Sequence, residues 1–389
     1  MHFESRSSKP EAALRVAFIA GTLGQGGTER QLLYMVRSLQ EAGCLVQVCC
    51  LTRGEANEAE LRKNGIEAIW VGRHGNPPAR VVEIVKALRP FQPHVVQSMH
   101  SFANLYAALP ALALGAISAG SLRCDLKLSA RENGRWAKWL LRVPDGLVVN
   151  SKMLHGQVTH ANVLTPDRLY YLANRVDLDF FGAPRLNRHV PVALFIGRLI
   201  REKRLDRFLQ ALAIARNNCT LRAIVAGDGP ERQAMETLAL NLGIAEHVEF
   251  LGSRDDIPNL LAQSDMLALT SDSEGSANVI LEAMAGRLPV ITTPAGDAAT
   301  TVTSGVTGFV VPFEDTEALA RRMVDLANSA ELRVQMGKAG RASAESQFGL
   351  KGLSEDMYAI YVDIGRRKQN RRLLDLSKSK EAAVPCVKP

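Results

Sequence analysis

The sequence lacks an apolar run of the roughly 18 residues that would suggest a membrane-spanning helix. Its longest apolar stretch, residues 105–117, is rich in alanine and contains Pro110, so we expect a buried helix there. Residues 1–13 are polar and show no secretory signal pattern. These absences favour a cytoplasmic globular protein over a membrane-spanning or exported one.

Cysteine is also scarce, and its six occurrences lack the spacing of a metal site. Cys49 and Cys50 are adjacent in a strand-like run, and the others are scattered along the chain. In a chain with no export signal, we expect buried reduced thiols rather than disulfides or ligands. No other metal cluster is evident, because the pair Asp255–Asp256 fits the start of a helix. We therefore expect no metal and no other cofactor.

The second half of the chain carries no net charge. Residues 186–389 hold 25 basic and 25 acidic side chains, whereas residues 1–185 hold 22 Lys and Arg against 15 Asp and Glu. A solvated surface would explain this excess, and attraction to an anionic membrane surface is the alternative. No motif that combines aromatic and basic residues accompanies the charge, so we expect no nucleic acid partner.

Short apolar strands alternate with helix-length segments along the chain. Near-continuous apolar strands between helices are typical of parallel sheets covered on both faces. The pattern predicts an α/β protein of two Rossmann-like, doubly wound domains that face each other across a cleft, with ligands outside the carboxyl ends of the strands. The expected strands are residues 14–20, 45–51, 94–98, 126–130 and 146–150 in the first series, and 192–196, 221–226, 247–251, 266–270 and 289–293 in the second.

A segment without apolar periodicity separates the two series of strands. Its Pro and Arg content suits an interdomain linker over residues 183–191. We therefore expect an N-terminal domain over residues 1–182 and a C-terminal domain over residues 192–350. Apolar residues with helical spacing follow in 351–367, and we expect the basic tail, 368–389, to be disordered.

The first expected strand runs into a glycine-rich turn. Gly24, Gly26 and Gly27 precede a helix-like segment, so backbone N–H groups could approach an anion at the helix start. The spacing is neither the dinucleotide fingerprint G-x-G-x-x-G nor the phosphate-binding pattern G-x-x-x-x-G-K. An anion site and a tight turn without a chemical role both stay open.

Two cations follow the first strand of the second series. Arg198 and Lys203 lie in the loop just past residues 192–196. Together they could neutralise a diphosphate, because Arg offers a planar fork of donors and Lys a point charge. As solvated surface charges they would need no ligand, and the residues alone leave both interpretations open.

The stretch SEGSANVILEAM, residues 273–284, places one acid in a loop and another in the helix that follows. We expect Glu274 at the loop tip and Glu282 inside the helix, with Ser276 or Asn278 as the helix cap. Carboxylates can accept hydrogen bonds from ligand hydroxyls, and N–H groups at the helix start can hold phosphate oxygens. A solvated loop acid and a surface helix residue are the alternative.

Continued through residue 296, this stretch resembles the signature of the retaining glycosyltransferases of family 4, which have the two-Rossmann-domain fold called GT-B. Further motifs resemble the family in the same order along nearly the whole chain. They are GGTERQLLYMVRSLQEAG, VVNS, NRVDLDFF, GRLIREK, GDGPER, FLGSRDDIPNLLAQSDMLALTS and TGFVVPFED. Each motif is weak alone, and their number and order make the resemblance specific.

The resemblance implies a reaction and a role for each candidate residue. A retaining transferase would move a sugar from a nucleotide-sugar donor, without a divalent metal, to a glycan or lipid-linked acceptor in polysaccharide or glycoconjugate synthesis. By resemblance, Arg198, Lys203 and Glu274 are catalytic, with the two cations on the donor diphosphate and Glu274 on the donor sugar. The other implied donor contacts are Glu282 on the ribose, Gly275, Ser276, Ala277 and Asn278 around the sugar and phosphates, Gly26 and Gly27 near the phosphate, and Arg254 beside the base.

The sequence departs from the family pattern where the acceptor would bind. Many relatives carry a histidine after the strand that corresponds to residues 126–130, and this sequence has Arg131 and Glu132 there. His100 lies near another family landmark, so His100, Arg131 and Glu132 are the acceptor-side candidates. Thr300 stands where relatives usually have a glutamate beside the donor. The resemblance also implies that a helix in 351–367 returns to the N-terminal domain.

Two other functions stay open. A binding-only or inactive relative would use the same cleft to hold a nucleotide or a partner chain. An oxidoreductase built on two Rossmann units is disfavoured, because the dinucleotide fingerprint is missing.

Overall fold

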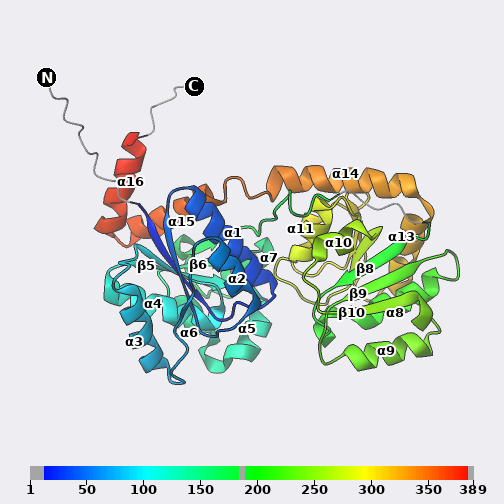
Figure 1. Cartoon of the computed structure of the whole chain (residues 1–389), viewed down its shortest axis with the longest axis horizontal. Coiled ribbons are helices and arrows are strands. Elements are labelled where there is room, and N and C mark those ends of the chain that lie inside the picture. The colour runs from blue at the N-terminus through cyan, green and yellow to red at the C-terminus, as the bar shows by residue number, and fades with distance from the viewer. Residues whose placement is uncertain (1–12, 184–188, 384–389) are drawn as a thin grey trace. The chain divides into compact units, whose positions relative to one another are not determined.

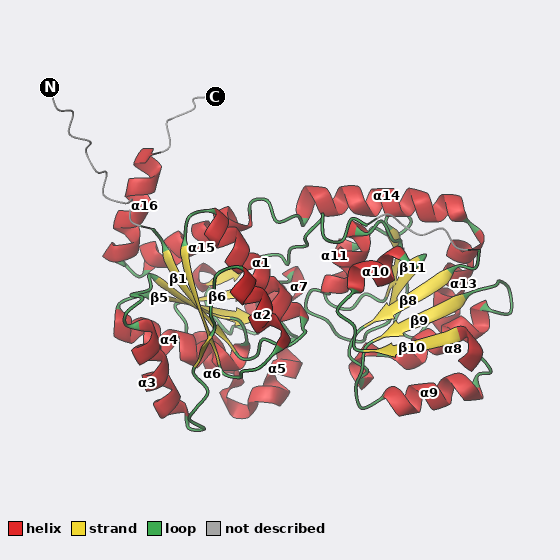
Figure 2. Cartoon of the chain, viewed as in Figure 1, coloured by secondary structure: helices red, strands yellow, loops and turns green. Residues whose placement is uncertain are grey.

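The computed structural model describes residues 13–183 and 189–383, and the chain forms two compact α/β units (Figure 1). The first unit contains the described residues up to 149, residues 155–172 and those from 351 onward, and the second contains residues 150–154 and 173–350. Each unit has a parallel sheet flanked by helices (Figure 2). The predicted fold class of two Rossmann-like α/β domains is confirmed.

The first unit is built on a seven-stranded parallel sheet in the order β3-β2-β1-β4-β5-β6-β7. Strands β4, β5 and β6 are buried at every residue, which requires cover on both faces of the sheet. Strands are added in opposite directions on the two sides of β1, so β1 and β4 flank the point where open α/β sheets bind ligands. The strands are β1 (Arg15–Ala20), β2 (Leu45–Cys50), β3 (Ile69–Trp70), β4 (Val95–Ser98), β5 (Ile117–Leu122), β6 (Gly146–Val149) and β7 (Leu169–Tyr171). The α-helices are α1 (Gly27–Glu41), α2 (Ala56–Lys63), α3 (Pro77–Leu88), α4 (Asn104–Leu114), α5 (Leu126–Asn133), α6 (Ala137–Arg142), α15 (Leu353–Arg367) and α16 (Arg371–Ala383).

The second unit has a six-stranded parallel sheet in the order β10-β9-β8-β11-β12-β13. Here the order reverses between β8 and β11, so loops after these two neighbouring strands meet at one edge of the sheet. The strands are β8 (Val192–Ile196), β9 (Arg222–Ala226), β10 (Val248–Gly252), β11 (Met266–Leu269), β12 (Val290–Thr292) and β13 (Gly308–Val310). The α-helices are α8 (Leu205–Ala215), α9 (Arg232–Asn241), α10 (Ile257–Ala262), α11 (Asn278–Ala285), α12 (Ala298–Thr301), α13 (Thr316–Asn328) and α14 (Ala330–Gln347), and α7 (Lys152–His160) begins in this unit.

One expected strand of the first series is wrong. Residues 126–130 form the start of helix α5, because the Asp125 side chain accepts a hydrogen bond from the Lys127 N–H and caps the helix. The strand lies earlier, at β5, whose Ala, Gly and Ser residues show little strand preference in sequence. Packing explains their small size, since a Cβ on Gly120 would collide with the Pro144 ring.

The boundary between the units also differs from the expected one. We expected the first domain to extend to residue 182, whereas residues 173–182 belong to the second unit. Val176 N–H donates to the Phe348 carbonyl, and Arg341 donates to the Leu178 carbonyl, so this segment is bound to the end of α14. Most of the expected linker, residues 184–188, lies outside the described residues.

The C-terminal segment forms two helices that belong to the first unit. On α15, the Tyr361 hydroxyl is buried and donates to Gln97 on β4. The expectation of a disordered tail is wrong for the described part, because α16 occupies most of it. Asn370 accepts from the Leu373 N–H at the start of this helix, and Leu373 is fully buried. Residues 384–389 lie outside the described range. Among the helices described, none combines the length and the apolar character that crossing a bilayer requires.

The five cysteines of the described residues are all free thiols. Cys44, Cys49 and Cys50 are buried, whereas Cys124 and Cys219 are partly exposed. Burial raises the pKa of Cys49 to about 12, so this side chain stays protonated. Reduced thiols were expected and are confirmed here, and burial is confirmed for three of them.

The stability of the first unit is expected to fall in mild acid. His94 is buried, with Nδ1 accepting from the Arg15 N–H at 3.0 Å. Burial lowers the pKa of His94 from 6.5 to about 4, and the charges of Arg372 and Arg15 act in the same direction. Between these two values the unfolded chain binds a proton that the folded chain excludes, so stability is complete above pH 6.5 and declines toward pH 4.

Thermal melts across this range check the role of His94. His94→Asn keeps an acceptor for Arg15 and should flatten the decline in melting temperature, because asparagine does not titrate there. His74→Asn, at an exposed histidine, is the control and should leave the decline unchanged. An unaltered pH profile in His94→Asn would contradict the assignment.

Candidate functional site

Two loops of the second unit, which follow the neighbouring strands β8 and β11, bring two predicted residues together. Lys203 ends the short turn Arg201–Lys203 after β8, and Glu274 lies in the loop after β11. Lys203 Nζ donates to Glu274 Oε1 at 2.5 Å, and the Ser271 hydroxyl donates to the same oxygen at 2.6 Å. The two charged side chains are only 21% and 11% exposed, so solvent screens this ion pair weakly. The interpretation of Glu274 as a solvated loop acid is therefore wrong.

Hydrogen bonds between the two loops fix the position of Lys203. The Thr270 hydroxyl reaches the carbonyl oxygens of Lys203 and Arg204, at 3.2 and 2.8 Å. The Asp272 N–H donates to the Glu202 carbonyl at 2.9 Å. Because these bonds join backbone to backbone or to a buried hydroxyl, the loops hold the Lys203–Glu274 pair as one assembly.

A buried arginine contacts the loop after β11, which carries Glu274. Arg207 on α8 is 1% exposed, and it donates to the Thr270 carbonyl at 2.7 Å. Its other nitrogen contacts Asp272 at 3.0 Å and Glu314 at 3.1 Å. An arginine is rarely buried without partners of this kind. Arg207 could not be singled out from the sequence, since there it is one of several charges on an amphipathic helix.

Arg198 lies on the same loop as Lys203. It follows β8 directly, and its side chain is exposed. A Cβ on Gly197 would lie 3.7 Å from Lys203 Cδ, so the lysine stem runs alongside the residue before Arg198. Arg198 therefore offers an accessible cation on the loop that also carries Lys203.

Helix α11 carries the second acid. Glu282 is 6% exposed, so the alternative of a surface helix residue is wrong. The expected cap is also wrong: the residue before the helix is Ala277, and its side chain makes no cap hydrogen bond. Asn278 Oδ1 instead accepts from Asn174 Nδ2 at 2.7 Å, and the same amide donates to the Ser276 carbonyl. In the first turn of the helix, the Ile280 N–H donates to the Ala277 carbonyl at 3.1 Å.

A third loop, after β12, supports the Glu274 loop. Gly296 has φ of +60°, and a Cβ there would collide with the backbone carbonyls of Glu274 and Gly275, so this position requires glycine. The Asp297 N–H donates to the Gly275 carbonyl at 3.1 Å. Thr300, at the position where relatives have a glutamate, donates to the Asp297 carbonyl at 2.9 Å.

Asp297, a buried acid just after Gly296, was not among the residues predicted from the sequence. Its buried carboxylate accepts from the Ser151 hydroxyl and from the N–H groups of Lys152 and Met153, at 2.8 to 3.0 Å. A carboxylate at a helix start is favourable because the first N–H groups lack partners and carry partial positive charge. Asp297 therefore anchors the first turn of α7 to the loop after β12.

Arg254 lies apart from this pair in the sheet order, after strand β10. It is exposed and binds Asp256 in a two-point ion pair, with both hydrogen bonds at 2.7 Å. These bonds raise the pKa of Arg254. A role beside a nucleotide base stays a prediction.

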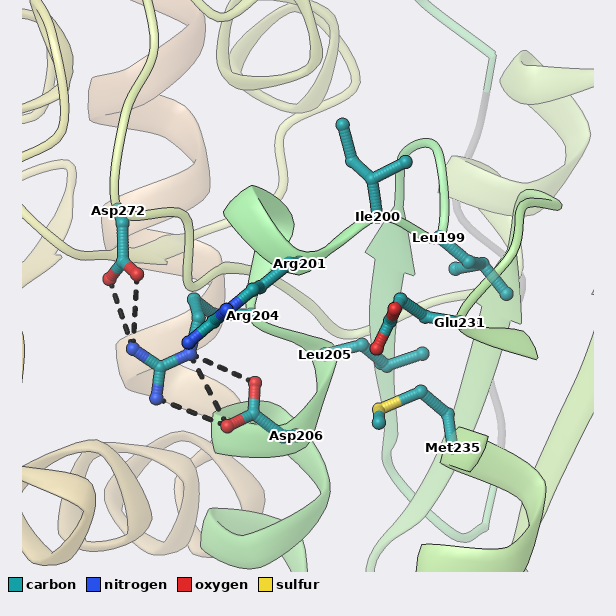
Figure 3. Close-up of a pocket in the computed structure, with 9 residues that line it drawn as sticks. All are labelled: Leu199, Ile200, Arg201, Arg204, Leu205, Asp206, Glu231, Met235 and Asp272. Atoms are coloured by element: carbon teal, nitrogen blue, oxygen red, sulfur yellow. Dashed lines mark hydrogen bonds and ion pairs between the residues drawn. The ribbon is translucent and has the colours of Figure 1, made fainter. Parts of the chain in front are cut away.

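A pocket of about 590 Å³ opens beside the loop after β8 (Figure 3). Arg204 stands at one side of it and bridges Asp206 and Asp272. The hydrogen bond to Asp206 is the main reason that the pKa of Arg204 is raised. Its charge is therefore already neutralised by protein carboxylates. The lining residues are Leu199, Ile200, Arg201, Arg204, Leu205, Asp206, Glu231, Met235 and Asp272, so the pocket does not include the Lys203–Glu274 pair.

In the first unit, His100 lies at the edge of the sheet where β1 and β4 end. Its Nδ1 accepts from the Gly21 N–H at 3.2 Å, so Nε2 carries the proton and faces Glu29 Oε1 at 3.3 Å. Glu29 is 7% exposed, and its carboxylate covers Gly26, where any Cβ would collide with it. The anion at this helix start is thus a protein carboxylate.

The other acceptor-side candidates are not where we expected them. Arg131 and Glu132 are exposed in the last turn of α5, because residues 126–130 are helical. The first residue after the strand is Arg123, which the sequence analysis missed. Burial lowers the pKa of Arg123 to about 10, and the charge of Glu29 acts in the opposite direction. Correct placement of β5 would have directed attention to Arg123.

Two family models match successive parts of the chain. The model described as Glycosyltransferase Family 4 matches residues 25–180. The model described as Glycosyl transferases group 1 matches residues 179–343 and includes every donor-side residue described above except Gly26 and Gly27, which the first model includes. The two matches overlap at residues 179 and 180.

Curated relatives are similar over part of their length. N-acetyl-alpha-D-glucosaminyl L-malate synthase of Bacillus anthracis is 32% identical over 182 residues, which are 47% of this chain and 48% of that protein. D-inositol 3-phosphate glycosyltransferase of Streptomyces scabiei is 29% identical over 229 residues, which are 53% of this chain and 51% of that protein. The chain spans about half the length of the curated relatives it matches.

Solved structures are similar over most of the chain. HepE of Anabaena, in complex with UDP and glucose, has a TM-score of 0.78 at 20% identity, covering 89% of this chain and 98% of that one. The lipopolysaccharide outer core galactosyltransferase WaaB, in its apo form, has a TM-score of 0.70 at 18% identity, covering 89% and 99%. At these identities the likeness shows the fold, which is the GT-B fold.

Proposed function

We propose, since this chain belongs to glycosyltransferase family 4, that it transfers a sugar from a nucleoside-diphosphate sugar to an acceptor hydroxyl with retention at the anomeric carbon. The observation that carries the proposal is the Lys203–Glu274 pair at the ends of strands β8 and β11. A cation suited to a diphosphate and a carboxylate suited to sugar hydroxyls lie within one hydrogen bond of each other, where α/β sheets bind ligands.

In the proposed reaction, the bond between the anomeric carbon and the diphosphate oxygen breaks, and the acceptor oxygen forms the new bond on the same face. The acceptor proton passes to the departing phosphate. Negative charge grows on that phosphate, and Lys203 and Arg198 stabilise it more in the transition state than in the ground state. The N–H groups at the start of α11 add donors to the same charge. Because these groups suffice to neutralise a diphosphate, we propose a metal-independent reaction.

Donor binding changes the partners of Glu274. In the described structure this carboxylate accepts from Lys203 and Ser271. A sugar hydroxyl can replace one of these donors, which leaves Lys203 for the diphosphate. Glu282 is proposed to accept from the ribose, and the backbone of Gly275 through Asn278 to surround the sugar.

The substrates are proposed from chemistry and from relatives. HepE was solved with UDP and glucose, so a UDP-sugar is the first donor to test. Other curated relatives are named a lipopolysaccharide core biosynthesis glycosyltransferase and a phosphatidylinositol monomannoside mannosyltransferase, and a glycan or lipid-linked acceptor is proposed for this chain. Thermal shifts with UDP-, GDP- and ADP-sugars would identify the donor, since a ligand of the folded state raises its melting temperature.

Incubation with the radiolabelled donor and a lipid extract tests transfer itself. The proposal is supported if labelled product still forms after a chelator has removed divalent metals. Donor binding without labelled product from any acceptor would favour a binding-only relative and would contradict it.

A further inference from the structure

Two tryptophans are exposed on the surface of the first unit. Trp136 is 53% exposed and ends the short turn Gly134–Trp136, and Trp139 is 45% exposed within the helix α6 that follows. Their rings meet edge to face with centroids 5.9 Å apart. Tryptophan is usually well buried, so an adjacent exposed pair indicates a surface that binds something.

The fold creates this pair by burying the opposite face of α6. Ala137, Leu140 and Leu141 are all buried and attach the helix to the first unit. With that face fixed in the core, the tryptophans point outward. About half of each indole side chain is therefore exposed, whereas a core residue is fully covered by its neighbours.

Basic residues lie close to the tryptophans in sequence. Lys127, Arg131, Arg135, Lys138 and Arg142 are all exposed between residues 126 and 143, where Glu132 is the one acidic residue. The Arg135 guanidinium lies 5.1 Å from the centre of the Trp136 ring. The aromatic and basic residues of this segment were not predicted to form a surface, because exposure cannot be read from the sequence.

We infer that this surface, the residues Lys127, Arg131, Arg135, Trp136, Lys138 and Trp139, binds the interface of an anionic lipid bilayer. Tryptophan favours the boundary between head groups and acyl chains, because its ring is large and apolar and its N–H is polar. Lysine and arginine beside it are attracted to anionic head groups. A short amphipathic segment of this composition lies on a membrane rather than across it.

A nucleic acid strand fits this surface less well. Successive bases stack on aromatic faces that offer parallel platforms along a groove. The two indole planes here are inclined by 68° to each other, and Arg135 already occupies a face of Trp136.

The surface continues into the edge of the first unit that holds His100, Glu29 and Arg123. Helix α5 begins just after Arg123, at the end of β5. At its other end, Asn133 Nδ2 donates to Ser101 Oγ at 3.3 Å, next to His100. If the acceptor is lipid-linked, a bilayer at this surface places its head group near that edge. This last step rests on the proposed function, whereas membrane binding does not.

Vesicle sedimentation tests the inference with the full chain. The protein should sediment with vesicles that contain phosphatidylglycerol, and less with phosphatidylcholine alone or in high salt. Trp136→Ala/Trp139→Ala should weaken partitioning by about tenfold through lost apolar burial. Arg135→Gln/Lys138→Gln should weaken it by about thirtyfold at low salt, at about 1 kcal/mol for each charge.

Matched controls distinguish binding through this surface from non-specific adsorption of the protein to vesicles. Leu112→Ala removes a residue that is 77% exposed on α4, a helix with no charged residue, and should leave partitioning unchanged. Lys338→Gln/Lys351→Gln removes two exposed charges from elsewhere and should have little effect. Circular dichroism checks that each variant is folded.

Several outcomes would overturn the inference. They are no binding to anionic vesicles, an equal loss in the control variants, or retention of single-stranded oligonucleotides that the tryptophan variants abolish. Transfer to a water-soluble acceptor, measured on the same samples, keeps the two proposals separate. A tryptophan variant that loses vesicle binding and keeps such transfer supports the surface, and a chain that binds vesicles without any transfer contradicts only the proposed function.

Discussion

Replacing Lys203 with alanine is expected to lower the rate of sugar transfer by about a hundredfold to a thousandfold, the usual cost of removing one fixed donor from a developing oxyanion. Lys203 is the cation that reaches Glu274 at 2.5 Å, on a turn held to the neighbouring loop by Thr270. Without Lys203, the departing diphosphate loses a fixed positive charge. Glu274 still accepts a hydrogen bond from the Ser271 hydroxyl. Initial rates with labelled donor give the effect.

Two variants on the same loop make this result interpretable. Arg201→Ala removes an exposed cation from the same turn and should change the rate little. Lys203→Arg keeps the charge but changes its shape, so an intermediate rate is expected. Turnover at the wild-type rate in Lys203→Ala would end the assignment of Lys203 to the diphosphate.

Replacing Arg207 with methionine is expected to destabilise the second unit by about 3 kcal/mol, as removal of one partner from a buried charged network does. The side chain is 1% exposed, and its loss leaves the buried Thr270 carbonyl without that donor. Thr270 in turn holds the carbonyls of Lys203 and Arg204. Transfer activity should therefore fall with stability, even though Arg207 does not reach the loop surface.

Urea unfolding followed by circular dichroism measures the change in stability. The matched control is Arg322→Met on α13, where the side chain is 46% exposed and pairs with Asp325, and a change within about 0.5 kcal/mol is expected. If Arg207→Met unfolds at the same urea concentration as the wild type, the network does not stabilise the loops in the way described.

The strands of the second unit could be predicted because each is a short apolar run bounded by turn residues. The expected ranges for β8 through β12 agree with the structure to within one residue at each end. Strand β13, of three residues beginning with Gly308, was not predicted, because glycine shows little strand preference. Its place in the sheet comes from parallel pairing with β12.

The first unit shows where local pattern and tertiary packing disagree. Residues 126–130 alternate like a strand, yet the Asp125 cap starts a helix there. The nearby strand β5 consists largely of small residues that only a crowded sheet interior requires. This misplacement also led to Arg131 and Glu132, instead of Arg123, as candidates on this side.

Local pattern was enough to predict the fold class, because strand and helix periods and motif order are properties of neighbours along the chain. The sequence identified Lys203 and Glu274, which lie far apart in sequence, but not that they share a hydrogen bond. That contact, the burial of Arg207 and Glu282, and the exposure of Trp136 and Trp139 follow from the packing of distant elements. Burial and pairing depend on which elements pack together, so the same charged or aromatic residue can be solvated, buried or displayed with no change in its local sequence.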